Sequence, residues 1–112
     1  MTDVLSETFA ALADPTRRAM LVQLTRGEAT VTQLAAPHSL SLPAISRHLK
    51  VLEAAGLVST RRDGQSRPKR LEAEALKRAD DWMAQYRAFF EERLDHLETH
   101  LATMVARTKK EN

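Results

Sequence analysis

The charged residues of this 112-residue chain are unevenly distributed. Residues 41–70 contain seven Lys or Arg against two acids, a net charge of +5, whereas residues 1–40 sum to −1 and residues 71–112 to −2. Guanidinium and ammonium groups neutralise phosphates and donate hydrogen bonds to base edges. A cationic segment on an otherwise nearly neutral chain is therefore typical of a nucleic-acid-binding surface.

A capped amphipathic helix is predicted inside this cationic segment, over residues 41–55. Ser41 is a typical N-cap, and Gly56 follows the last turn. The apolar side, with spacings of four and three, consists of Ile45, Leu49 and Leu52. An ordinary solvated face is the alternative for the opposite side, but the basic hairpin that follows favours DNA contact, with Ser46 and Arg47 closest to the bases. The predicted DNA contacts of this helix are Ser41, Leu42, Pro43, Ser46, Arg47 and Lys50.

The basic hairpin is predicted from two strand-like runs, residues 57–61 and 67–71, around Asp63-Gly64, a strong turn signal. Its five cations cannot all face a duplex, because side chains alternate between the two faces of a strand. Arg62 and Arg67, which flank the turn, are the predicted phosphate or minor-groove contacts. The tip residues Gln65 and Ser66 are further candidates, and a tip that serves only solubility is the alternative.

Three shorter helices are predicted before this segment. The first covers residues 5–13, and the second begins at Asp14-Pro15, where Asp caps and Pro takes the first helical position, and ends at Gly27. The third is predicted to begin at Thr32 as its cap. Backbone N–H groups at its start, together with Thr32 and Gln33, can meet a phosphate.

One long helix is predicted over residues 74–107, which contain no Gly or Pro and carry apolar side chains every three or four positions. Such a helix spans about 45–50 Å, longer than so small a domain can cover. From Phe90 onward the apolar spacing is that of helix-on-helix association, which predicts a homodimer; an effector pocket among the aromatic residues is the alternative. The predicted dimerisation residues are Leu5, Phe9, Leu12, Trp82, Tyr86, Phe90, Leu94, Leu97 and Leu101.

The histidines suggest two structural environments. His48 lies near the edge of the apolar stripe of its helix, so we expect it to be packed and hydrogen-bonded rather than to read a base. His96 and His100 share one helix face with Glu92, a spacing that can hold zinc. A solvated face is the favoured interpretation, so no metal site and no cofactor are predicted.

Several function classes are disfavoured by composition. The chain has no cysteine, hence no disulfide and no thiolate metal site. It has no glycine-rich phosphate loop and no recognisable catalytic grouping, so an enzyme is not expected. No apolar run approaches the ~20 residues of a membrane span, and the first residues do not form a signal-peptide core. We expect a cytoplasmic protein without a membrane partner.

The order of these elements is that of a winged helix-turn-helix protein: a mostly α fold with a two-stranded β wing and a long C-terminal dimerisation helix. The segments FAALADPTRRAMLVQL and LSLPAISRHLKVLEAAGLV resemble the ArsR/SmtB family of bacterial transcriptional repressors, in particular its cysteine-free, SdpR-like members. The resemblance covers residues 5–101. Two departures are evident: Leu42 replaces a glutamine frequent in the family, and TVTQLAA lacks the cysteine pair of the metal sensors.

The resemblance implies a homodimeric repressor that binds double-stranded DNA at an inverted-repeat operator. It implies one domain over residues 1–112, with dimerisation helices at 1–13 and 74–107, the helix-turn-helix at 32–55 and the wing at 57–71. Two alternatives remain open. One is a winged-helix protein-interaction module that does not read DNA, and the other is a sensor released from DNA by a metal or an unidentified small-molecule effector.

Overall fold

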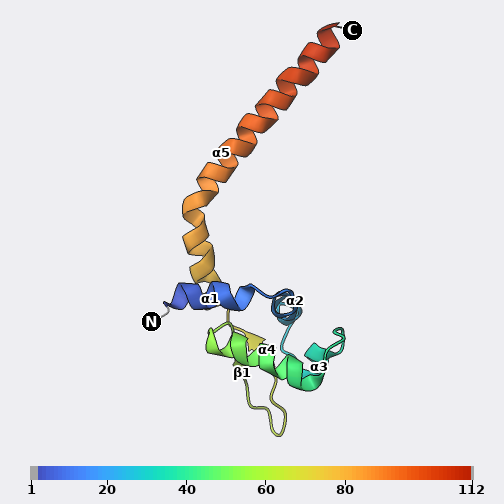
Figure 1. The fold of residues 1–112 in the computed structure, drawn as a ribbon, viewed down its shortest axis with the longest axis vertical. Helices are drawn as coiled ribbons and strands as arrows, with labels where there is room; N and C mark the ends of the chain where they lie inside the picture. The colour runs from blue at the N-terminus through green and yellow to red at the C-terminus, as the bar shows by residue number, and fades with distance from the viewer. Residues whose placement is uncertain (1–2, 112) are drawn as a thin grey trace. The chain divides into compact units, whose positions relative to one another are not determined.

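The computed structural model describes residues 3–111, with side chains to residue 109. Within this range the chain forms helices and one two-stranded antiparallel sheet (Figure 1), which confirms the predicted fold class. The elements in chain order are α1 (Val4–Leu12), α2 (Pro15–Leu24), α3 (Val31–Ala35), α4 (Leu42–Ala54), β1 (Val58–Thr60), β2 (Lys69–Leu71) and α5 (Ala73–Glu111).

Short polar residues begin the helices. Asp3, Asp14 and Ser41 are the N-caps of α1, α2 and α4, and each side chain accepts a hydrogen bond from the backbone N–H three residues further on. Pro15 and Pro43 lie in the first turns of α2 and α4, where a helix has no partner for the N–H that proline lacks. The caps predicted at Asp14 and Ser41 are confirmed.

The predicted cap of α3 was wrong. Thr30, not Thr32, begins this helix, through a reciprocal capping box: the Gln33 backbone N–H donates to the Thr30 hydroxyl at 3.3 Å, and the Thr30 backbone N–H donates to Gln33 Oε1 at 2.9 Å. The T-x-x-Q spacing that permits this pair was present in the sequence. Thr32 is consequently an exposed residue in the first turn.

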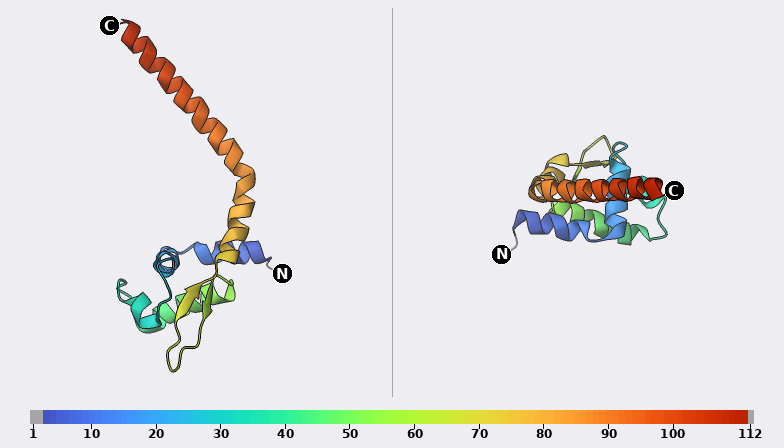
Figure 2. Two further views of the ribbon diagram at one scale, coloured as in Figure 1. Left: turned by 180° about the vertical axis from the view of Figure 1, so that it is seen from behind. Right: turned by 90° about the horizontal axis from the view of Figure 1, so that it is seen from above.

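The core lies between α2, α3, α4 and the sheet, and the views of Figure 2 show these elements gathered together. The apolar stripe predicted for α4 is confirmed, since Ile45, Leu49 and Leu52 are at most 2% exposed. Leu34 of α3 and Leu57 before β1 are also fully buried. The residues predicted to be buried in α2 are buried as well: Met20, Leu21 and Leu24.

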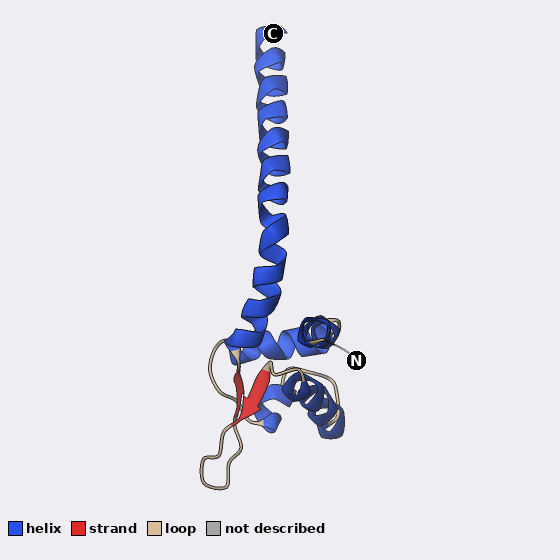
Figure 3. Ribbon diagram, turned by 90° about the vertical axis from the view of Figure 1, so that its left-hand side faces the viewer, coloured by secondary structure: helices blue, strands red, loops and turns tan. Residues whose placement is uncertain are grey.

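The wing is an antiparallel hairpin in which Thr60 lies opposite Lys69. The same register continues to an isolated bridge between Asp63 and Ser66, and Gly64 between them has a φ of 63°, as the first central residue of a type II′ turn requires. Figure 3 shows the two strands in red with the loop extending beyond them.

Both strands are shorter than predicted, and Pro68 accounts for this. The backbone N–H of Arg61 donates to the Pro68 carbonyl at 2.8 Å, but proline has no N–H to return the bond. The ladder is therefore interrupted between the strands and the turn. On its other edge, β2 gains a partner, because Lys69 and Ala29 exchange two backbone hydrogen bonds of 2.7 and 3.0 Å.

The chain divides into two compact units, Met1–Ala79 and Asp80–Asn112, and α5 contributes to both. The first contains α1 to β2 and the start of α5, where Ala75 and Ala79 are buried. The described part of the second is helix alone. The helix predicted over residues 1–13 is observed from Val4, and its first two residues lie outside the described part of the chain.

Candidate nucleic-acid interface

The outer side of α4 presents the polar residues that were predicted to contact DNA. Arg47 and Lys50 are exposed, and Ser46 is half-buried. Neither cation forms an ion pair with another described side chain. The Arg47 guanidinium is thus available to an external anion, and so is the Lys50 ammonium group, which interacts with the nearby Glu53 charge without forming an ion pair.

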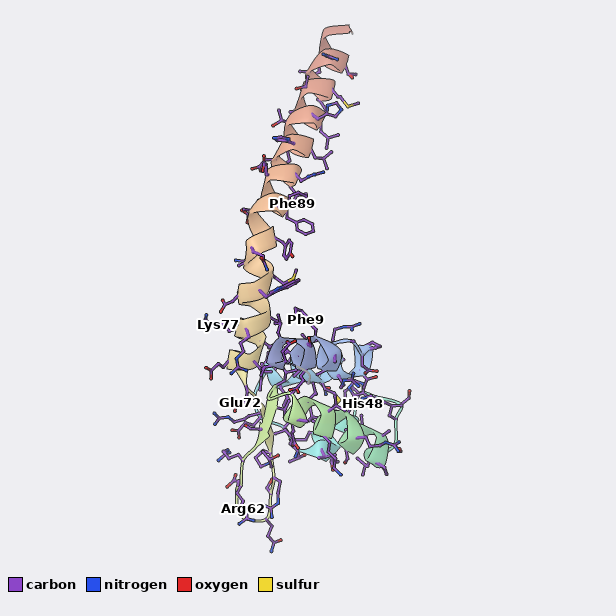
Figure 4. All side chains as sticks on the ribbon, turned by 60° about the vertical axis from the view of Figure 1, so that its left-hand side comes forward. Phe9, His48, Arg62, Glu72, Lys77 and Phe89 are labelled. Atoms are coloured by element: carbon purple, nitrogen blue, oxygen red, sulfur yellow. The ribbon has the colours of Figure 1, made fainter. Side chains whose placement is uncertain are left out.

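His48 is packed, as predicted. Its Nδ1 atom lies 3.4 Å from Arg17 Nη1 and 3.8 Å from an Asp14 carboxylate oxygen. Arg17 also donates to the carbonyls of Ala10 and Ala11 at the end of α1. Figure 4 shows His48 on the side of α4 that faces the N-terminal helices. This contact ties α4 to the α1–α2 corner and removes His48 from the outer side.

The start of α4 is exposed. Ser41 Oγ accepts a hydrogen bond of 3.3 Å from the Ala44 backbone N–H, and both Leu42 and Pro43 are open to solvent. In α3, Thr32 and Gln33 are exposed too, but the side-chain oxygen of Gln33 already accepts the hydrogen bond from the Thr30 backbone N–H. Contact of these residues with DNA stays a prediction.

Glu53, in the last turn of α4, links this helix to both strands of the wing. Its Oε1 atom accepts hydrogen bonds from Thr60 Oγ1 on β1 at 2.9 Å and from Lys69 Nζ on β2 at 2.7 Å. Lys69 Nζ also donates to Thr60 Oγ1 at 2.7 Å, which closes a triangle. Partial burial raises the pKa of Glu53, but the hydrogen bonds from Lys69 and Thr60 outweigh it and the net pKa is lowered.

Arg61 and Arg70, on the wing, are also neutralised by carboxylates. Arg61 donates through Nε and Nη2 to Glu28 at 2.7 to 3.0 Å, which lowers the pKa of Glu28 and raises that of Arg61. Arg70 donates to Glu72 at 3.1 Å. The pKa of Glu72 is lowered first by the hydrogen bond from Ser59 and further by Arg70.

Arg62 and Arg67 remain unpaired. The register places them opposite each other between the strands and the turn, on the sheet face that also carries Thr60 and Lys69. Both are exposed and form no ion pair with a described side chain, and Figure 4 shows Arg62 near the end of the wing. Like charges directly opposite each other are unfavourable without a counter-ion.

The seven cations of residues 41–70 therefore fall into two groups. Arg61, Lys69 and Arg70 are held by carboxylates. Those without such a partner are Arg47, Lys50, Arg62 and Arg67. A hollow of about 120 Å³ lies between α4 and β2, and it is lined by Val31, Ser46, Leu49, Lys50, Glu53 and Lys69. The outer side of α4 and the Lys69 face of the wing are thus neighbours, and Gln65 and Ser66 at the tip are exposed.

The second unit carries an unusual apolar surface. Its residues predicted for dimerisation are 40–61% exposed: Trp82, Tyr86, Phe90, Leu94, Leu97 and Leu101. The Trp82 and Tyr86 rings lie 5.1 Å apart, and Arg93 stacks over Phe89 at 4.5 Å. In α1, Phe9 is 36% exposed, and Leu5 and Leu12 are half-buried. Contiguous apolar exposure of this kind marks an interaction surface.

The histidine face of α5 does not gather metal ligands. Among residues 3–111, no three His, Asp or Glu side chains come together in a group that could hold a metal ion. His96 and His100 are exposed side chains on the helix. Over the same range, every helix is too short or too polar to span a lipid bilayer.

Comparison with known proteins decides the family. Residues 14–60, which contain α2, α3, α4 and β1, match the family described as bacterial regulatory protein, arsR family. The transcriptional repressor SdpR of Bacillus subtilis is 34% identical over 82 residues, which cover 73% of this chain and 91% of that protein. The chain belongs to the ArsR family. Members of this family are transcriptional regulators and not enzymes, and this chain is thus a DNA-binding transcriptional regulator.

Solved ArsR-family structures share the fold. The ArsR-family regulator RHA00566 superposes with a TM-score of 0.72 at 39% identity, covering 80% of this chain and 98% of that one. The winged helix-turn-helix DNA-binding domain of Mb0332 from Mycobacterium bovis, described as homodimeric, gives a TM-score of 0.60 at 29% identity, with 84% of each chain covered. The predicted winged helix-turn-helix fold is therefore confirmed.

Sequence reasoning missed the residues that hold the wing in place. Glu53 was not among the predicted residues of α4. Glu28 and Ala29 precede α3, in a segment for which no prediction was made from the sequence. The pairs that they form join residues 7 to 40 positions apart, and no spacing rule links such residues.

Proposed function

We propose that this ArsR-family regulator is a cytoplasmic homodimeric repressor that occupies an inverted-repeat operator. The observation that carries the proposal is the set of four unpaired cations, Arg47, Lys50, Arg62 and Arg67, on the outer side of α4 and on the wing. In a winged helix-turn-helix protein these elements meet the major groove and the adjacent backbone.

We assign base contacts to Ser46 and Arg47, at the exposed N-terminal half of α4. Leu42 can add an apolar contact to a thymine methyl group. Lys50, Arg62 and Arg67 are assigned to phosphates, because each is exposed and unpaired. Further contacts with DNA are proposed for Thr32, Gln33, Ser41, Pro43, Gln65 and Ser66.

We propose that the apolar face of α5 and the apolar side chains Leu5, Phe9 and Leu12 of α1 form the dimer interface. The large apolar side chains between Trp82 and Leu101 are at least 40% exposed in one chain, and a second copy supplies an equally apolar surface. The description of the Mb0332 domain as homodimeric supports a homodimer. The proposal includes no metal and no small-molecule effector.

The test is selection of DNA from a random pool by the purified protein. The expected result is an inverted repeat with half-sites about one helical turn apart, or a multiple of that. Sedimentation should give a dimer that binds one such site. Recovery of unrelated sequences, or of no DNA, would instead favour a protein-interaction module.

A further inference from the structure

Glu53 lies where the recognition helix and the wing meet, and it touches both strands of the hairpin at their last ladder pair. Thr60 and Lys69 are opposite each other in the register, and both donate to the same carboxylate oxygen. Beyond this pair the ladder is broken at Pro68, so the outer part of the wing depends on its base for orientation.

The Lys69 ammonium group is committed to this contact. Its side chain is 14% exposed, and it donates to both Glu53 and Thr60 at 2.7 Å. Three hydrogen-bonding atoms in a closed triangle fix the distance between α4 and the hairpin more tightly than apolar packing does, because hydrogen bonds are directional.

Two further contacts hold the opposite side of the wing base. Arg61 binds Glu28 through two nitrogens, and Ala29 pairs with the Lys69 backbone. Both partners belong to the segment between α2 and α3. The Arg61 contact lies on the other face of the hairpin, since neighbouring side chains alternate. The base of the wing is thus held from both faces.

We propose that Glu53 is a positioning residue for DNA binding: it fixes the wing relative to α4, so that Arg62 and Arg67 reach the backbone while Arg47 is seated in the groove. Arg62 and Arg67 lie two residues beyond Thr60 and before Lys69, on the same face. A rotation of the hairpin about its base would displace them together. The inference rests on the proposed function, because DNA binding is the activity that it affects.

Whether replacement of Glu53 strengthens or weakens DNA binding distinguishes a positioning role from a purely electrostatic one. Replacement of Glu53 removes a negative charge beside Lys50 and Lys69, which by charge alone strengthens binding to DNA. A positioning role predicts weaker binding. Glu53→Ala removes the acceptor and Glu53→Gln keeps one acceptor oxygen, so the two variants lose the same charge and differ in whether a hydrogen bond to Lys69 and Thr60 is still possible.

The experiment measures operator affinity and its salt dependence for the full-length dimer. We expect Glu53→Ala to weaken operator binding about tenfold, with Glu53→Gln in between and a shallower salt dependence for Glu53→Ala. Glu7→Ala, at an exposed residue of α1, is the control with the same change of charge. Arg62→Ala combined with Arg67→Ala should weaken the unmodified protein but have little further effect in Glu53→Ala.

A second measurement does not involve DNA. Amide NMR relaxation of residues 62–67 should show increased motion in Glu53→Ala and unchanged motion in Glu7→Ala, while thermal unfolding confirms that both variants fold. Equal or tighter operator binding by Glu53→Ala, or a wing no more mobile than in the unmodified protein, would overturn the inference. Failure of the unmodified protein to prefer any operator would instead contradict the proposed function.

Discussion

The salt dependence of DNA binding follows from which cations are free. Each phosphate contact releases counter-ions and contributes about 0.9 to the slope of log K against log salt. Lys50, Arg62 and Arg67, which are assigned to phosphates, give six phosphate contacts in a dimer, and hence a slope of about −5; if Arg47 also meets a phosphate instead of a base, the slope is about −7. If all seven cations of residues 41–70 met phosphates, the slope would be about −13.

The assay is operator affinity measured between 50 and 300 mM KCl, roughly the range in which such slopes are resolved. Arg67→Ala should reduce the slope by about one per subunit, and it should weaken operator and random DNA alike. Arg70→Ala serves as the matched control, because Glu72 already neutralises this side chain, and it should leave the slope unchanged. A slope steeper than about −10, or an equal loss for Arg70→Ala and Arg67→Ala, would show that the ion pairs open on DNA and would refute the division into paired and unpaired cations.

Three further predictions test the remaining assignments. Arg47→Ala should cost about 1–3 kcal/mol at the operator and reduce the ratio of operator to random-DNA affinity; an unchanged ratio would remove Arg47 from the base contacts. Leu97→Asp should yield monomer or unfolded chain by sedimentation at micromolar concentration, because it places a charge in the apolar face of α5, whereas a folded dimer would contradict the interface. The carboxyl pKa values of Glu28, Glu53 and Glu72 are lowered in the folded state, so the stability that they contribute is present above about pH 4.5 and lost as pH falls through their folded pKa values. Thermal unfolding between pH 6 and pH 3 should therefore show a steep loss that is smaller in Glu53→Gln, and equal losses would contradict the role of Glu53.

Local signals predicted much of the fold. The cap at Ser41, the apolar stripe of α4 and the glycine turn at Gly64 each depend on residues within a few positions of one another, and each was placed correctly. The cap of α3 is the instructive error, because its signal was equally local: Thr30 and Gln33 form the reciprocal pair that a capping box requires. The prediction placed the cap two residues too late, at Thr32, which has no Gln or Glu three positions further on.

The outward direction of the wing cations was only partly predictable. Alternation along a strand showed that the five could not share one face, and Arg62 and Arg67 were assigned to DNA because they flank the turn. The other three cations, Arg61, Lys69 and Arg70, are not counted as DNA contacts because carboxylates elsewhere in the chain bind them. These carboxylates are Glu28, Glu53 and Glu72. Which carboxylate reaches which cation depends on the packing of α4 against the hairpin, and no local pattern in the sequence encodes that distance.

The separation of paired from unpaired cations has a consequence for how the wing binds DNA. Paired cations stabilise the base of the hairpin in the free protein, so little conformational freedom is left to lose on binding. The unpaired Arg62 and Arg67 repel each other in the free protein, and a phosphate between them removes that repulsion. The five cations of the wing therefore have opposite effects on the free fold: the three paired with carboxylates stabilise it, and the two near the turn favour the bound state.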